Sequence, residues 1–442
     1  MKMRTEQKTA VKNSIGRLVF VALSVLLQVI WICVQAMKLN RYSTWISVAT
    51  SVLTLVVVIL LYGRRTNAAF KMPWIILILA FPVLGLGMYL LFGRKEATQL
   101  VRERFERIDQ SLDGLLIQDK AVRIKLQQTD RMAANEAEYI WNYAKYPIYQ
   151  NTDVVFYKEA SEGIEAQKQA LNQAKHFIFM EYHAIEDKQS FGELKEILAR
   201  KAKEGVEVRL FYDDIGSIGF INTDFIQRME AEGIQCRVFN RLMPVLNVFM
   251  NNRDHRKITV IDGKIGFTGG YNLADEYFNI THPYGYWKDT GVRLEGDAVR
   301  SLTVMFLEMW NAIKGTDTDY TPYFLQDGAQ PHEAGLAGSV GVTQSDANIA
   351  ADSASGFVQP YADSPLDGEP VGENVYMGVV KAASEYVYFT TPYLIISDEM
   401  SRELCLAAKR GVDVRIVTPG IPDKKLVYRV TRSYYAQLAS AG

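Results

Sequence analysis

The sequence contains very little cysteine and almost no net charge. Its 442 residues include three cysteines, Cys33, Cys236 and Cys405, which lie far apart. This spacing suggests neither a disulfide framework nor a zinc site. The formal net charge is −1 and no basic tract occurs. Both features argue against a nucleic-acid-binding protein, because such proteins need positive charge to meet the phosphate backbone. A P-loop and a dinucleotide fingerprint are also missing.

Apolar residues are concentrated near the start of the chain. Three stretches of bilayer-spanning length contain no charged side chain: Leu18 to Met37, Trp45 to Gly63 and Pro73 to Gly93. A signal peptide has a shorter apolar core, and two more such stretches do not normally follow it. We therefore predict that residues 1–95 form transmembrane helices of a multi-pass cell-membrane protein. Pro82 makes a kinked or re-entrant third helix an alternative. Basic residues on both flanks leave the membrane side open.

Charged residues and then alternating apolar patterns follow the membrane region. Residues 96–145 are rich in charge with interspersed apolar positions, and we predict a helical linker there. Phe177 to Tyr182 and Val206 to Tyr212 have strand patterns, and Phe191 to Glu204 between them has the pattern of an amphipathic helix. This alternation is typical of α/β architecture with a mostly parallel sheet.

One α/β unit occurs twice in the sequence. Ala174 to Met180 and Leu198 to Leu210 are similar to Ala383 to Phe389 and Leu406 to Ile416, about 200 residues later. The repeat indicates two related lobes.

The repeat sets the predicted domain boundaries. The first lobe covers residues 146–324 and the second covers 357–442, and a flexible linker at 325–356, rich in Gly, Ala and Ser, joins them. The second copy reaches Gly442, the last residue, where a counterpart of the strand after His255 is expected. We therefore predict that the second lobe is incomplete.

A histidine and a lysine two residues apart carry the strongest chemical signal. The residues from Lys257 to Ile261 are β-branched and apolar enough to form a strand. Positions i and i+2 of a strand face the same side, so His255 and Lys257 can converge on one phosphate. Imidazole can attack phosphorus, and an ammonium group can hold phosphoryl oxygens.

A predicted hairpin follows this pair. Asp262-Gly263 is a favoured two-residue turn, after which a second strand, Ile265 to Thr268, returns the chain beside the first. Gly270 allows a backbone amide to approach an anion, and Asn272 can donate from its side chain. Asp262 has two alternative interpretations, as a participant in the chemistry or as the first residue of a turn.

These residues resemble the His-x-Lys-x-x-x-x-Asp signature of the phospholipase D superfamily. With the N-terminal apolar stretches, the chain is similar to bacterial cardiolipin synthases of that superfamily. The resemblance implies a duplicated α/β sandwich. It also implies transfer of a phosphatidyl group between two phosphatidylglycerol molecules, which gives cardiolipin and glycerol without a metal or any other cofactor. Phosphatidylglycerol and cardiolipin are thus the expected membrane partners, and nucleic acid is not.

The family pattern also assigns roles to single residues. His255 matches the histidine that becomes phosphatidyl-histidine or acts as acid/base, and Asp262 matches the aspartate of the signature. Lys257, Gly270 and Asn272 would bind the phosphate. Further on, Asp289 matches an acidic residue that orients the histidine.

The family uses two such motifs, and this sequence has one. We expect a truncated chain, and a homodimer in which two first motifs meet is the alternative. Two other functional classes stay open: a phosphodiesterase or nuclease of the same superfamily, and a non-catalytic membrane protein.

Overall fold

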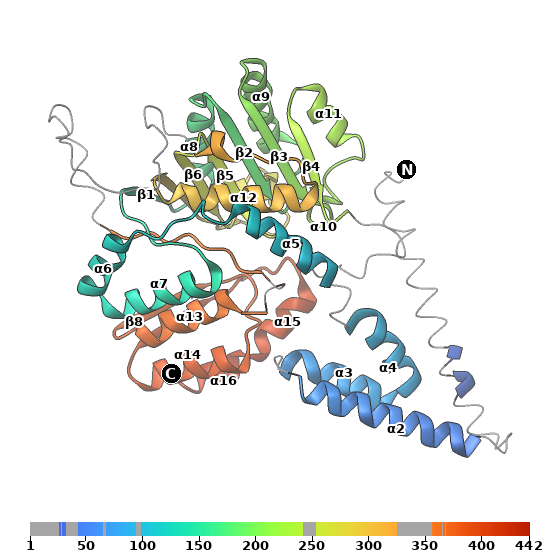
Figure 1. Ribbon diagram of the computed structural model, residues 1–442. Helices are drawn as coiled ribbons and strands as arrows, with labels where there is room; N and C mark the ends of the chain where they lie inside the picture. Colours follow the sequence, from blue (N-terminus) through green and yellow to red (C-terminus); the bar gives the residue numbers. More distant parts are fainter. Residues whose placement is uncertain are drawn as a thin grey trace. The chain divides into compact units, whose positions relative to one another are not determined.

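The computed structural model describes residues 26–27, 29–31, 43–64, 68–93, 99–241, 253–324, 356–364, 366 and 368–442. Their contacts divide the chain into two compact units (Figure 1). The N-terminal unit consists chiefly of residues up to 102. The main unit consists of most of the remaining chain, and it holds the predicted motif. The predicted linker at 325–356 lies almost entirely outside the described residues.

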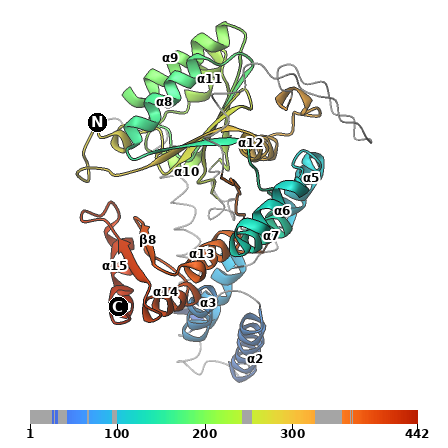
Figure 2. The same cartoon turned by 90° about the vertical axis from the view of Figure 1, so that its left-hand side faces the viewer.

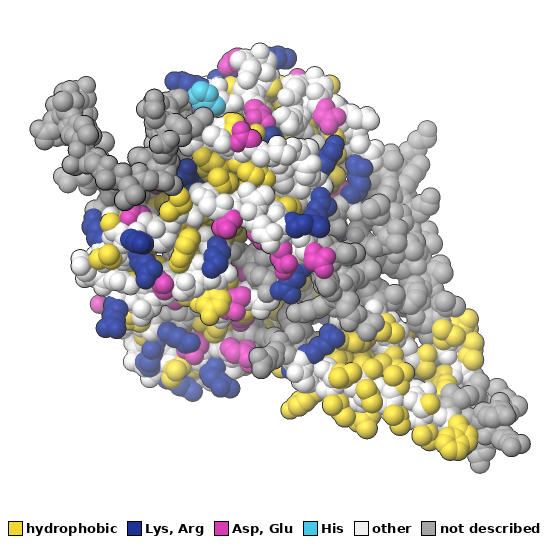
Figure 3. All heavy atoms as spheres, viewed as in Figure 1, with side chains coloured by type: hydrophobic (Ala, Val, Ile, Leu, Met, Phe, Trp, Pro, Cys, Tyr) yellow, Lys and Arg dark blue, Asp and Glu magenta, His cyan; other side chains and the backbone are white. Residues whose placement is uncertain are grey.

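The N-terminal unit is helical. Its elements are α2 (Ser43–Tyr62), α3 (Ala68–Ala80), α4 (Pro82–Met88) and the π-helix η1 (Tyr89–Gly93). The third apolar stretch is interrupted at Phe81, directly before Pro82, as expected for a proline that cannot continue the preceding helix. Gly85 is needed where α3 and α4 meet, because a Cβ there would lie 2.6 Å from the Ile78 Cα. Apolar side chains gather on the surface of this unit (Figure 3).

Three membrane-spanning helices are not confirmed by the structure. Within the described ranges, no helix combines the length and apolar character that crossing a bilayer requires. Most of the first predicted stretch, Leu18 to Met37, lies outside the described residues. The third is divided between α3, α4 and η1, so it is not one continuous helix.

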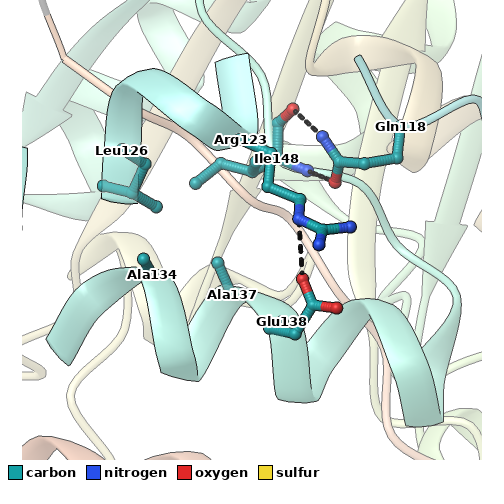
Figure 4. Close-up of a pocket in the computed structure, with 7 residues that line it drawn as sticks. All are labelled: Gln118, Arg123, Leu126, Ala134, Ala137, Glu138 and Ile148. Atoms are coloured by element: carbon teal, nitrogen blue, oxygen red, sulfur yellow. Dashed lines mark hydrogen bonds and ion pairs between the residues drawn. The ribbon is translucent and has the colours of Figure 1, made fainter. Parts of the chain in front are cut away.

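Three helices lie in the segment where we predicted a helical linker. They are α5 (Gln99–Leu112), α6 (Lys120–Thr129) and α7 (Arg131–Ala144). Asp119 and Asp130 cap α6 and α7 through their carboxylates. A hollow between α6 and α7 is bordered by an Arg123–Glu138 ion pair of 3.1 Å and is too small for a water molecule (Figure 4). It is therefore no ligand site.

A seven-stranded mixed sheet forms the first lobe. Its strands are β1 (Thr152–Tyr157), β2 (Phe177–Tyr182), β3 (Glu207–Asp213), β4 (Gln235–Phe239), β5 (Lys257–Ile261), β6 (Ile265–Gly269) and β7 (Gly291–Gly296). The order is β1-β7-β6-β5-β2-β3-β4. Only β2–β3 and β3–β4 are parallel, and the other pairs are antiparallel. The prediction of a mostly parallel sheet was therefore wrong, because the hairpin after β5 adds antiparallel strands.

Helices cover both faces of this sheet (Figures 1 and 2). One face carries α8 (Ala160–Asn172), α9 (Gln189–Lys203) and α11 (Phe225–Ala231), and the other carries α12 (Val299–Ile313). All six residues of β2 are buried. Met180 belongs to the core on the α9 side and Phe179 to the core on the α12 side. A strand buried on both faces explains the continuous apolar run in the sequence.

Short elements complete the first lobe: α10 (Asp214–Ser217), η3 (Asp275–Phe278) and η4 (Thr321–Tyr323). The second lobe contains α13 (Val371–Ala382), β8 (Tyr386–Thr390), α14 (Asp398–Lys409), β9 (Asp413–Val417), α15 (Lys425–Ser433) and α16 (Tyr435–Ala439). β8 and β9 pair in parallel, as β2 and β3 do. The order α13-β8-α14-β9 repeats α8-β2-α9-β3, as the sequence repeat indicated.

Candidate active site

His255 and Lys257 meet at the start of β5. Lys257 is the first residue of the strand and pairs there with Tyr182 of β2, and His255 lies two residues before it. The Lys257 Nζ atom is 2.6 Å from the His255 carbonyl oxygen and 3.2 Å from its Nδ1 atom. Lys257 is buried and His255 is exposed. A buried ammonium group thus contacts an imidazole that solvent can reach.

The surroundings keep His255 neutral at ordinary pH. Desolvation, followed by the positive charges of Lys257, His183 and Lys424, lowers the pKa of His255 to about 4. Burial lowers the pKa of Lys257 to about 8, and nearby carboxylates oppose that shift. At pH 7 a neutral imidazole therefore lies beside a lysine that is mostly protonated.

A second histidine, His183, lies next to His255. The two ring centroids are 4.7 Å apart. The His183 Nδ1 atom is 2.7 Å from the carbonyl oxygen of Asp254, the residue before His255. Desolvation is the largest cause that lowers the pKa of His183. Sequence reasoning missed this residue, because only the pairing of β2 with β5 brings it beside His255.

Asp289 and Gly270 lie together near Lys257. The Asp289 carboxylate accepts from the Thr290 N–H at 2.8 Å and from the Trp287 Nε1–H at 3.4 Å. Its negative charge acts on Lys257, and it makes no hydrogen bond to His255 in the structure. A Cβ at Gly270 would lie 2.1 Å from Asp289 Oδ1. Gly270 is therefore required for the close approach of Asp289, and its own N–H donates to the Thr290 carbonyl.

Asn272 is buried beneath the site. Its Oδ1 atom accepts from the Ala184 N–H at 3.1 Å, and its Nδ2 atom donates to the Tyr277 hydroxyl at 2.9 Å. These bonds attach the segment after β6 to the end of β2. The structure thus places Asn272 as a support for the strand ends, and its predicted contact with phosphate remains a prediction.

Asp262 lies at the other end of β5. It is five positions after Lys257, which corresponds to about 16 Å along a strand. Its carboxylate accepts three backbone hydrogen bonds, all of 2.8 Å, from Lys175, His176 and Phe177. Both Asp262 and Gly263 have positive φ, as the predicted turn requires. Because Ile261 pairs with Ile265, however, the loop has three residues and not two. The structure does not bring Asp262 to His255.

No group of His, Cys, Asp and Glu in the described residues could hold a metal ion. The described site contains the imidazole of His255, the ammonium group of Lys257 and the carboxylates of Asp254 and Asp289, which act on Lys257. A nucleophile next to a cation suits chemistry at an anionic centre such as a phosphodiester.

This α/β lobe and its histidine–lysine pair define a phospholipase D-like protein. A family model described as "Cardiolipin synthase, PLD-like domain" matches residues 168–310 and 376–442, and one described as "Phospholipase_D-nuclease N-terminal" matches residues 50–94. A cardiolipin synthase of Halalkalibacterium halodurans is 31% identical over 414 residues, which are 90% of this chain and 76% of that protein. The chain belongs to the cardiolipin synthase family of the phospholipase D superfamily of enzymes.

Two further comparisons extend this result. An uncharacterized protein of Streptococcus mutans is 38% identical over 386 residues, which are 87% of this chain and 79% of that protein. The crystal structure of a phosphatidylserine synthase from Haemophilus influenzae aligns with a TM-score of 0.45 and 13% identity, and covers 69% of this chain and 73% of that one. The structural likeness is too low to carry an argument about activity, so the family assignment rests on the sequence matches.

Proposed function

We propose that this protein transfers a phosphatidyl group from one phosphatidylglycerol molecule to another and thereby forms cardiolipin and glycerol. The observation that carries the proposal is the contact between a neutral His255 and a protonated Lys257, in a chain related to cardiolipin synthases over most of its length. A neutral imidazole is nucleophilic, and the lysine offers positive charge to the phosphoryl oxygens.

The reaction has two displacements at phosphorus. An imidazole nitrogen of His255 attacks the first phosphatidylglycerol, the bond from phosphorus to the headgroup oxygen breaks, and that oxygen takes a proton from water as glycerol leaves. A headgroup hydroxyl of the second phosphatidylglycerol then gives its proton to water and attacks the same phosphorus. The P–N bond breaks and returns its electron pair to the imidazole. Lys257 offsets the negative charge that develops on the phosphoryl oxygens in both steps.

The ring of His255 changes partners in this scheme. A lysine that donates to Nδ1 leaves the ring proton on Nε2, which then has no lone pair for attack. When a phosphate enters, Lys257 donates to its oxygens instead, and the proton moves to Nδ1. The Nε2 lone pair is then free to attack. Asp289, which lies near Lys257, is proposed to support this rearrangement and to orient the ring.

We infer that the N-terminal unit brings the protein to the membrane that contains its substrates. α2 contains no charged residue, and large apolar side chains on it are exposed, among them Leu55, Ile59 and Leu60. Such a surface is more stable in contact with lipid than with water. This proposal gives the apolar start of the chain a role that suits a lipid substrate.

The test uses the purified full chain in detergent with radiolabelled phosphatidylglycerol. Cardiolipin and glycerol should appear in equal amounts. Quenching in a mildly alkaline denaturant, which preserves the acid-labile P–N bond, should leave label on the protein but not on His255→Ala. Release of phosphatidic acid without cardiolipin would support a phosphodiesterase instead. Degradation of DNA with no change in the lipid would support a nuclease. The absence of protein-bound label and of both products would refute the proposal.

A further inference from the structure

The peptide that leads into His255 is held on both sides by side chains from neighbouring strands. The Asp254 N–H donates to Asp213 Oδ2 at 3.2 Å, and the Asp254 carbonyl oxygen lies 2.7 Å from His183 Nδ1. A carbonyl oxygen can only accept, so His183 carries its proton on Nδ1. The backbone N–H and the backbone carbonyl of Asp254 are therefore both hydrogen-bonded, directly before the proposed nucleophile His255.

The two holding residues are themselves fixed. His183 follows β2 and Asp213 ends β3, and the two strands pair in parallel beside each other. Asp213 is fully buried and also accepts from the N–H groups of Ile215 and Gly216 at 2.9 and 3.1 Å. These bonds, with one from Arg253 Nη1 to Asp213 Oδ1 at 3.3 Å, attach the segment before His255 to the end of β3.

Gly216 makes room for His183. A Cβ at this position would lie 2.1 Å from the His183 carbonyl oxygen and 2.8 Å from His183 Nε2. The Nε2 atom, the one ring nitrogen not bonded to Asp254, therefore lies against the Gly216 backbone. Because Nε2 lies against this backbone, the His183 ring is better placed to hold the Asp254 carbonyl than to exchange protons with a substrate.

The ring of His183 also packs against His255. The centroids are 4.7 Å apart and the planes are inclined by 51°. The charged groups that act on His183 are Asp213, Asp254 and Lys257. Two imidazoles at this distance repel when both are protonated, so each favours the neutral form of the other. Burial and the charge of His183 therefore both lower the pKa of His255.

We propose that His183 is a positioning residue for the reaction at His255. Its Nδ1–H fixes the Asp254 carbonyl while Asp213 fixes the N–H, and its ring limits the directions that the His255 imidazole can take. This inference rests on the proposed function, because it assigns His183 a part in the same phosphatidyl transfer. It explains how His255, which is exposed and lies before β5, is held in one orientation.

Two variants of His183 distinguish a hydrogen bond that positions Asp254 from a proton transfer by the ring. His183→Ala removes the hydrogen bond and the ring, whereas His183→Asn keeps an N–H donor near the place of Nδ1. The Ala variant should lower kcat for cardiolipin formation by about 100-fold with little change in KM, because a displaced nucleophile loses its alignment. The Asn variant should recover most of that loss, and His282→Ala, an exposed histidine elsewhere, should match the wild type.

A second measurement does not depend on turnover. Histidine-labelled protein is titrated by ¹⁵N NMR, and the His255 signal is assigned from its loss in His255→Gln. The pKa of His255 should rise by about one unit in His183→Ala and by less in His183→Asn. If the wild type makes no cardiolipin, the proposed function fails, and this titration still tests the positioning.

Three outcomes would overturn the inference. One is a His183→Ala protein with wild-type kcat and an unchanged His255 titration. Another is an Asn variant as inactive as the Ala variant, which would mean that the hydrogen bond to the Asp254 carbonyl does not carry the effect. The third is equal loss of thermal stability and activity in the Ala and Asn variants, which would mean a purely structural role.

Discussion

The two copies of the α/β unit differ in how far their strands are buried. Every residue of β2 is buried, whereas β8 has one buried residue, Val387, and β9 has none. In the first copy, β5 and β3 flank β2 and helices cover both faces. In the second copy, β8 pairs with β9 alone among the described residues. The repeated helix–strand unit alone therefore does not bury its strands. In the first lobe they are buried because further strands, β5 among them, and α12 pack around them.

The same difference locates the chemistry. Strand β5, which begins at Lys257, belongs to the part of the first lobe that has no counterpart in the described second lobe. The described second lobe also contains no histidine. Because His255 and Lys257 are in contact in the first copy, we expect substitutions there to have the largest functional effect.

Replacement of His255 by alanine should reduce phosphatidyl transfer at least about 1,000-fold, because a covalent mechanism has no nucleophile without it. The rate of cardiolipin formation from labelled phosphatidylglycerol is the measurement. His282→Ala is the matched control, and circular dichroism should show that both variants stay folded. Substantial activity in the His255→Ala protein would move the chemistry away from the first lobe.

Matched core substitutions test the difference in burial. Phe179 in β2 and Tyr388 in β8 occupy corresponding positions of the repeat. Phe179 is fully buried and stacks on Phe306 with centroids 4.5 Å apart, while Tyr388 is 51% exposed. Phe179→Ala should lower the free energy of unfolding by about 3–5 kcal/mol, and Tyr388→Ala by less than about 1 kcal/mol. Urea denaturation of both variants provides the values, and equal losses would contradict the comparison.

Asp262→Ala should destabilise the first lobe and leave its chemistry intact. Three backbone N–H groups at the start of β2 would lose their acceptor, at a cost of about 2–3 kcal/mol. Activity per folded molecule should stay within about threefold of the wild type. Asp262→Asn, which retains one acceptor oxygen, should lose less stability. A loss of rate as large as that of His255→Ala, measured where Asp262→Ala is fully folded, would restore the catalytic interpretation.

The sequence was most informative where a local pattern determines structure. The strand after His255, the positive-φ turn at Asp262 and Gly263, and the repeat of helix–strand units all follow from residue periodicity and turn chemistry. The mixed sheet did not follow, because strand order depends on long-range pairing that no local pattern contains.

The site shows the same limit. The spacing of His255 and Lys257 predicted that both side chains face the same side, where they could meet one phosphate. Nothing in the sequence linked them to His183, which precedes His255 by 72 residues along the chain. His183 lies beside His255 because β2 pairs with β5. The side chain of Asn272 looked available for phosphate, and the structure shows it bonded to Ala184 and Tyr277. Partners of buried polar groups depend on packing, and packing is decided by the whole fold.

The smallest expected effect concerns what the second lobe contributes to this site. Activity that needs neutral His255 and protonated Lys257 should show an acid limb near pH 4 and a basic limb near pH 8. The positive charge of Lys424, at the start of α15, helps to lower the pKa of His255. Lys424→Ala removes that charge, so the pKa of His255 should rise and the acid limb should move upward by less than about one unit. The basic limb, set by Lys257, should stay in place. The pH dependence of kcat/KM, which reports groups of the free enzyme, measures this in both proteins, with Lys409→Ala on α14 as the control. If the acid limb did not move, the charge of Lys424 would be screened by solvent, and the described second lobe would contribute no charge to the chemistry of the first.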